Sequence, residues 1–303
     1  MSFSRIAVLG PGLLGGSLAL ELAARRHVDL RLWARRAEPL DQARGMGVEG
    51  VLTTDLGEAL RGADLAVLCT PVGVMPALAQ RLVTIPDGPR TITDVGSVKE
   101  PLERSVGEVL VAAGRVFVGS HPMCGSELKG MEAARTGLYE GAVCVVTHPA
   151  DGEQETGNEM DAVCRFWEEM GMRVIRMGAA EHDSFVARVS HLPHAVAAVL
   201  ARVALETCPD AADLAAGGFR DTTRIAGGSP EMWREILVEN SHRVAPLLRE
   251  CASSLEEMAS ALERGDETSV LDALEAGKAS RNCFDDSVAR RSGSPPDSLQ
   301  TEL

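Results

Sequence analysis

Short apolar runs alternate with helical patterns of apolar residues along the first 178 residues of the chain. The runs predict strands at 5–9, 28–33, 65–69, 90–94, 115–119, 142–147 and 172–177. Apolar residues at helical spacing predict helices at 15–26, 37–45, 56–61, 74–82 and 100–113. Strands that alternate with helices predict an α/β fold, in which a doubly wound parallel sheet carries helices on both faces.

The pattern changes after Gly178, because helical spacing alone continues from there. It predicts helices within 180–206, 230–264 and 266–288, with Pro246 producing a kink or lying near the start of a new helix. We therefore expect a sheet domain at 1–178, an all-α domain at 179–290 and a disordered Ser/Pro-rich tail at 291–303. Residues 151–160 are polar and predict a surface loop.

A glycine-rich turn joins the first predicted strand to the first predicted helix. Gly10, Gly12 and Gly15 have the GxGxxG spacing that lets a dinucleotide pyrophosphate approach the backbone at a helix N-terminus. This context predicts a nucleotide-binding domain of the Rossmann type. Ligands of such sheets bind beyond the carboxyl ends of the strands. The candidate cofactor-binding residues are Gly10, Gly12, Leu13, Leu14, Gly15, Arg35, Arg36, Thr70 and Pro71.

The end of the second predicted strand bears on the choice of cofactor. An NAD-binding unit usually presents Asp or Glu to the ribose about twenty residues after the glycines. Here Arg35 and Arg36 occupy that place. A guanidinium pair suits a 2′-phosphate, which favours NADP, although such arginines can also stay solvated or stack on adenine beside NAD.

Composition and charge exclude several functions. The chain carries 30 basic and 44 acidic residues, and its net charge of −14 argues against a nucleic-acid partner. Seven cysteines without a CxxC pair indicate reduced thiols. We expect no signal peptide, no apolar run of membrane length and a cytoplasmic location.

The segment 195–205 is apolar around most of its circumference and has to be covered on several sides. A homodimer formed through the helical domain would cover it. Burial within one subunit would do so equally well.

Three polar clusters stand where the apolar pattern alone would not require them, at 93–99, at 119–127, and at 190–194 together with 217–226. In this combination and order the chain resembles the prephenate/arogenate dehydrogenase family of tyrosine biosynthesis, from residue 5 to about 260. The resemblance implies a Rossmann domain, a helical dimerisation domain and a small-molecule substrate. It also implies oxidative decarboxylation of prephenate to 4-hydroxyphenylpyruvate, or of arogenate to tyrosine.

The resemblance also implies roles for individual residues. His121, in the HPMxG(S/T) motif, matches the catalytic histidine, and a neutral imidazole is a suitable base for the hydroxyl proton. Ser97 matches the serine that hydrogen-bonds the hydroxyl and the histidine, although in isolation it would be a helix N-cap. Arg224 matches the arginine that binds a substrate carboxylate.

Other positions of the family pattern lie near the expected substrate. The resemblance implies that His194 faces the substrate and that Ser126 and Glu127 line the mouth of the site. His191 and His194 have a spacing that could serve a metal, but no third ligand accompanies them, and we expect none. The Glu181-His182-Asp183 stretch also occurs in the family, and we assign it no chemical role.

Competing interpretations make different predictions. A β-hydroxyacid-type dehydrogenase would use a lysine base in its helical half, yet no lysine occurs between residues 130 and 277. A non-catalytic NAD(P)-sensing protein would have lost His121, Ser97 or Arg224, and all three are present. Arogenate remains an alternative substrate, although the stretch 227–230 offers no carboxylate for its ammonium group.

Overall fold

The computed structural model describes residues 2–25, 27–125, 128–148 and 157–292 of the 303-residue chain. The chain divides into two compact units, Met1–Val244 and Ala245–Leu303, and each is described by itself. Ser126, Glu127, most of the expected loop at 151–160 and the expected tail from residue 293 onward lie outside the described residues. The domain boundary expected near Gly178 stays a prediction.

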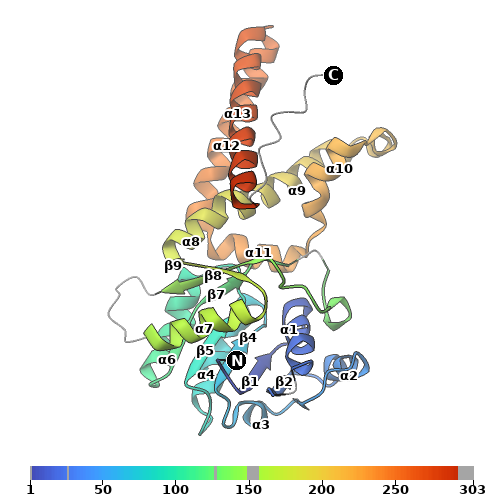
Figure 1. Cartoon of the computed structure of the whole chain (residues 1–303). Coiled ribbons are helices and arrows are strands. Elements are labelled where there is room, and N and C mark those ends of the chain that lie inside the picture. Colours follow the sequence, from blue (N-terminus) through green and yellow to red (C-terminus); the bar gives the residue numbers. More distant parts are fainter. Residues whose placement is uncertain (1, 26, 126–127, 149–156, 293–303) are drawn as a thin grey trace. The chain divides into compact units, whose positions relative to one another are not determined.

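A parallel sheet of six strands forms the centre of the first unit (Figure 1). Its order is β3-β2-β1-β4-β5-β6, and every neighbouring pair is parallel, which confirms the doubly wound fold. The strands are β1 (Arg5–Leu9), β2 (Asp29–Trp33), β3 (Val51–Thr53), β4 (Leu65–Leu68), β5 (Thr91–Asp94) and β6 (Val116–Val118). The strand order reverses between β1 and β4, so a ligand crevice is expected at their carboxyl ends.

Alternate side chains of each strand enter two separate cores. Ile6 and Val8 pack with the helices of one face, whereas Ala7 and Leu9 pack with those of the other. The first face carries α1 (Leu13–Ala23), α2 (Glu38–Gly45) and α7 (Gly157–Glu169). The second carries α3 (Leu56–Leu60), α4 (Met75–Val83), α5 (Glu100–Leu102), the π-helical turn η2 (Glu103–Gly107) and α6 (Glu108–Ala112). Each fully buried large apolar side chain contributes about 1.5–3 kcal/mol, so both faces hold the sheet in place.

A second sheet of three strands continues directly from β6. Its strands are β7 (Ser120–Pro122), β8 (Val143–His148) and β9 (Arg173–Gly178), with β7 antiparallel and β9 parallel to β8. The sequence pattern did not predict β3 or β7, because three residues are too few to show an alternation. The predicted strand at 115–119 ends before this segment, yet His121 lies in β7 and pairs with Val145.

Helical segments complete the first unit. They are α8 (Ala179–Val186), the π-helical turn η4 (Ala187–His191), α9 (Leu192–Leu205), η5 (Pro209–Leu214), α10 (Gly217–Thr223), η6 (Arg224–Gly227) and α11 (Pro230–Glu239). The expectation that no apolar run reaches membrane length needs correction, because the continuous helical run Ala179–Leu205 is long and apolar enough by composition. A core helix of a soluble protein passes the same test of length and composition. Val189 and Val203 on this run are 70% and 65% exposed, so an apolar face is open in the single chain.

The second unit contains α12 (Ser241–Glu263) from Ala245 onward and the whole of α13 (Glu267–Ser292). The predicted helical stretch 230–264 is two helices, because α11 ends at Glu239 and α12 begins at Ser241. Pro246 therefore lies near the start of a new helix, which is the second of the two positions expected for it. Asp266 immediately precedes α13, and its carboxylate accepts hydrogen bonds from the backbone N–H of Ser269 at 3.1 Å and from the hydroxyl of Ser269 at 2.7 Å.

Candidate active site

The glycine-rich turn has the geometry that a dinucleotide requires. Gly10 has a φ of +113°, and a Cβ on Gly15 would lie 2.0 Å from the carbonyl oxygen of Gly10. A Cβ on Gly12 would meet nothing within 4 Å, so that side of the turn is open. Gly12 is the N-cap of α1, and the first turn of the helix carries no acidic residue. The backbone N–H groups of Leu13 and Leu14 therefore lie at a helix N-terminus suited to an anion.

The other candidate cofactor residues follow β2 and β4 at the same edge of the sheet. The Oγ1 atom of Thr70 is buried and has no hydrogen-bond partner among the described residues, which leaves it available to a ligand. Arg35 and Arg36 are exposed at the end of β2. Nε of Arg36 lies 3.7 Å from a carboxylate oxygen of Glu38, a weak surface ion pair that a phosphate could replace. These groups fit a nicotinamide dinucleotide.

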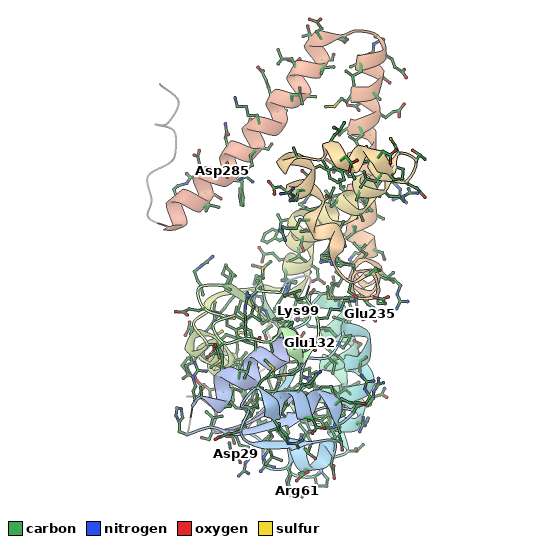
Figure 2. All side chains as sticks on the ribbon, turned by 90° about the vertical axis from the view of Figure 1, so that its right-hand side faces the viewer. Asp29, Arg61, Lys99, Glu132, Glu235 and Asp285 are labelled. Carbon is green, nitrogen blue, oxygen red and sulfur yellow. The ribbon has the colours of Figure 1, made fainter. Side chains whose placement is uncertain are left out.

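A buried ion pair holds the carboxyl end of β5 against the start of β7. The side chains of Asp94 and Lys99 are in contact, and neither is exposed. Nζ of Lys99 also donates to the carbonyl oxygen of Ser120 at 2.6 Å, and the backbone N–H of Ser120 donates to Asp94 at 3.0 Å. In Figure 2, Lys99 and Glu235 lie at the end of the sheet opposite Asp29 and Arg61. This network fixes the residue immediately before His121.

Ser97 lies between the two members of that ion pair and is half-buried. The helix that follows begins at Glu100, with Lys99 as its N-cap, so Ser97 is not a capping residue. The helix begins where the sequence predicts it, at residue 100, and this start is too far from Ser97 for the cap that the serine in isolation would suggest. The hydroxyl of Ser97 therefore does not serve the end of a helix.

The imidazole of His121 contacts a second histidine rather than solvent alone. Nδ1 of His121 lies 2.9 Å from Nε2 of His182 in α8, and Nδ1 of His182 lies 2.7 Å from Oδ1 of Asp183. Asp183 also accepts the backbone N–H groups of Lys99 at 2.8 Å and Glu100 at 2.9 Å. A carboxylate, two imidazoles and the end of β5 therefore form one continuous network.

The surroundings favour neutral imidazoles beside an ionised carboxylate. Burial lowers the pKa of His121 well below its usual value, and the positive charge of Lys99 acts in the same direction. Burial also lowers the pKa of His182. Burial alone would raise the pKa of Asp183, but hydrogen bonds from His182 and from backbone N–H groups hold it below its ordinary value.

A second pair of histidines follows on η4 and α9. The ring of His194 stacks on the indole of Trp233 with centroids 3.6 Å apart and an angle of 11°, and its Nδ1 atom is buried without a partner among the described residues. His191 is buried, and its Nδ1 accepts from the side-chain amide of Asn240 at 3.2 Å. The same amide nitrogen donates to the backbone oxygen of Asp183 at 2.8 Å. The histidine cluster of the helical segments is thereby joined to the network of His121.

Of the remaining residues expected at the substrate, the structure describes Arg224 but not Ser126 or Glu127. Arg224 is exposed at the start of η6, a segment that packs against α9. Its approach to His121 stays a prediction, as do the roles of Ser126 and Glu127, which lie outside the described residues.

Sequence reasoning missed His182, Asp183, Trp233 and Asn240. The sequence offered one signal, since an adjacent His-Asp pair within an apolar helical stretch is costly to bury unless the two are hydrogen-bonded. Trp233 lies within the predicted helical stretch 230–264, and nothing in the linear sequence indicates that His194 is its stacking partner.

Comparisons with known proteins show the family of the chain. Residues 18–176 match the family model "Prephenate dehydrogenase, nucleotide-binding domain" and residues 178–276 match "Prephenate dehydrogenase, dimerization domain". The chain is 29% identical to a cyclohexadienyl dehydrogenase of Zymomonas mobilis, over 92% of this chain and 95% of that protein.

Two solved structures share the fold over nearly their whole length. One is prephenate dehydrogenase from A. aeolicus in complex with hydroxyphenyl propionate and NAD+, with a TM-score of 0.82, 30% identity, and coverage of 94% of this chain and 99% of that one. The other is arogenate dehydrogenase from Synechocystis, with a TM-score of 0.73, 27% identity, and coverage of 92% and 99%. From its matched domains and its fold, the chain belongs to the prephenate dehydrogenase family.

Proposed function

We propose that the protein catalyses the oxidative decarboxylation of prephenate to 4-hydroxyphenylpyruvate with a nicotinamide cofactor. The observation that carries this proposal is the buried imidazole network of His121, which lies at the carboxyl edge of the same sheet as the glycine-rich turn. Such a position brings a base to the place where a nicotinamide domain of this type binds its ligand.

The chain's own residues perform the proton chemistry. His121, neutral at working pH, accepts the proton of the substrate hydroxyl as the carbonyl forms. Ser97 orients that hydroxyl, and Arg224 with His194 holds the substrate through its carboxylates. When bound, the nicotinamide ring supplies the hydride acceptor, and loss of carbon dioxide with aromatisation of the ring makes the step irreversible.

The backbone of the turn from Gly10 to Gly15 would hold the cofactor pyrophosphate, and Thr70 would donate to it or to the adjacent ribose. We propose NADP as the preferred cofactor, because Arg35 and Arg36 both stand exposed at the end of β2.

A hydrogen bond to a charged group contributes about 1.5–3 kcal/mol, so the double variant Arg35→Ala/Arg36→Ala should raise the KM for NADP about tenfold or more. The KM for NAD should change little. Arg61→Ala, at the opposite edge of the sheet, is the control. A wild-type enzyme that prefers NAD would contradict the proposal.

Absorbance at 340 nm tests the activity, with prephenate and arogenate each crossed against NAD and NADP. We expect turnover with prephenate, and turnover with arogenate alone would assign the alternative substrate. Absence of reduction in all four combinations would refute an enzymatic function. His121→Asn should remove turnover with little change in cofactor affinity, whereas His27→Asn, an exposed histidine before β2, should be unchanged.

The exposed apolar face of α8, η4 and α9 supports a further part of the proposal, a cytoplasmic homodimer formed through the helical segments. Val199 and Val203 are 52% and 65% exposed, and an apolar face of this kind is covered by a partner in stable assemblies. Light scattering should give twice the chain mass for the wild type. Val199→Asp/Val203→Asp should give the monomer, and Arg202→Ser on the same helix should leave the dimer intact. A monomeric wild type would end this part of the proposal.

A further inference from the structure

Two buried side chains, those of His182 and Asp183, stand in hydrogen-bonded order behind the imidazole assigned as the base. His182 is 1% exposed and Asp183 is fully buried, so water does not compete for their hydrogen bonds. Asp183 is fixed by two backbone N–H groups at 2.8 and 2.9 Å, and Asn240 holds the backbone of the same residue. The carboxylate therefore has one orientation, which is set by the loop that follows β5.

We infer that His182 and Asp183 are positioning residues that select the tautomer of His121 and stabilise its protonated form. The inference rests on the proposed function of His121 as the base. An ionised carboxylate only accepts, so Nδ1 of His182 carries a proton and donates it to Asp183. Neutral His182 then has a bare Nε2, which accepts from His121. The Nδ1 atom of His121 must carry the proton, and its Nε2 atom holds the free electron pair that a base needs.

The same arrangement accounts for the charge that develops in the reaction. The substrate O–H bond breaks, its proton bonds to Nε2 of His121, and its electron pair forms the carbonyl. The C–H bond of the same carbon breaks, and its electron pair leaves with the hydrogen as a hydride that the oxidised cofactor would accept. His121 becomes an imidazolium whose Nδ1–H still donates to His182. We call the hydrogen-bonded chain of His121, His182 and Asp183 the relay, and the positive charge is shared along it. Asp183 supplies the opposing negative charge at the far end. Catalytic triads use a buried carboxylate behind a histidine in this way.

The other charges around the relay make the carboxylate necessary. Burial and the positive charge of Lys99 disfavour an imidazolium at His121, and Lys99 is itself paired with Asp94. Around His182, Asp183 and Asp94 favour the charged ring, while Lys99 opposes it. Asp183 is the carboxylate that accepts the hydrogen bond of His182. Its removal should therefore lower the basicity of His121 and not only the stability of the fold.

Asp183→Asn is the test variant, and Asp64→Asn is its matched control. Asp64 likewise accepts two backbone N–H groups, from Ser4 and Arg5 at 2.9 Å each, but lies at the opposite edge of the sheet. We expect Asp183→Asn to lower kcat by about 10²–10⁴-fold, where the upper value is the effect of the same change in a catalytic triad, with the acid limb of kcat/KM moved to lower pH. Asp64→Asn should keep its kcat and its pH profile.

A second pair of variants separates the two contacts of His182. The amide oxygen of a Gln at position 182 can occupy the place of the His182 Nε2 atom and accept the hydrogen bond from His121. The shorter side chain of Asn reaches only the place of Nδ1, beside Asp183. His182→Gln should therefore retain more activity than His182→Asn. A loss of kcat in Asp183→Asn with an unmoved acid limb would show a merely structural role and overturn the inference. Activity equal to that of Asp64→Asn would overturn it as well.

Nitrogen-15 NMR of labelled histidine gives a readout that needs no substrate. The wild type should show His121 protonated at Nδ1 and bare at Nε2, and Asp183→Asn should shift the ring toward the other tautomer. His121 protonated at Nε2 in the wild type would overturn the inference. An enzyme inactive on both prephenate and arogenate would refute the proposed function while leaving this measurement able to decide the relay.

Discussion

Replacing Lys99 by Met tests whether the buried ion pair is what holds the site together. The substitution keeps most of the side-chain volume and removes only the ammonium group. Asp94 is left fully buried, with hydrogen bonds remaining from the backbone N–H groups of Gly96 at 2.8 Å and Ser120 at 3.0 Å. The carbonyl oxygen of Ser120 also loses its donor at 2.6 Å.

The expected magnitude follows from the lack of exposure on both sides. Breaking a buried pair by removing one partner costs about 3–5 kcal/mol, because an uncompensated charge stays in the interior. Arg104→Met provides the contrast, since its ion pair with Glu100 at 3.1 Å is 61% exposed on the arginine side. An exposed pair of this kind contributes about 1 kcal/mol or less. The two variants should therefore differ by several kcal/mol in the free energy of unfolding.

Urea unfolding followed by tryptophan fluorescence measures this difference. The indole of Trp167 donates to the hydroxyl of Ser120 at 3.0 Å, so its emission reports on the same part of the core. Lys99→Met/Asp94→Asn removes both charges and should recover a coupling energy of about 1–3 kcal/mol. A Lys99→Met protein within about 1 kcal/mol of the wild type would refute the reasoning, as would a double variant that recovers nothing.

Three further outcomes follow from particular contacts. Gly15→Ala puts a Cβ 2.0 Å from a backbone oxygen of the cofactor turn, so the cofactor KM should rise about tenfold or more, whereas Gly45→Ala, with open space, should bind normally; equal KM values would contradict this. Gly228→Ala puts a Cβ 2.7 Å from the indole that stacks on His194 and should raise the prephenate KM, while Gly227→Ala, which meets nothing, should not. Burial lowers the pKa of His191 to about 4, so its contribution to stability is complete above pH 6.5 and is lost as the pH falls through 4. The urea midpoint should fall over that range, and by less in His191→Gln; an equal fall would remove His191 from the account.

Local signals in the sequence were sufficient for most of the sheet. Strand β1 and the glycine turn lie within the first fifteen residues, and their pattern requires no distant partner. β7 could not be found in the same way, because its three residues are polar or proline and become a strand only through pairing with β8. The strand that carries His121 therefore depends on a partner that follows more than twenty residues later.

The relay behind His121 was beyond sequence reasoning for a similar reason. His121 and His182 are 61 positions apart, and neither position indicates the other. Lys99 illustrates the same limit, because a lysine is expected at the surface. This one is buried only because Asp94 and the carbonyl oxygen of Ser120 accept hydrogen bonds from its ammonium group. Burial of a charged group is a property of its partners, and partners are set by the fold.

The same polar contacts explain why the first compact unit continues to Val244 rather than ending with β9. α8 follows the last strand directly, yet its buried Asp183 is satisfied by the backbone N–H groups of Lys99 and Glu100 at the start of α5. At the surface, Glu235 of α11 also accepts a hydrogen bond from the backbone N–H of Gly73 at 3.2 Å. Buried polar groups lose several kcal/mol when their partners move away, so these segments cannot separate from the sheet without disturbing the relay. A change in the helical segments should therefore affect the base at His121, even where it leaves the Rossmann sheet intact.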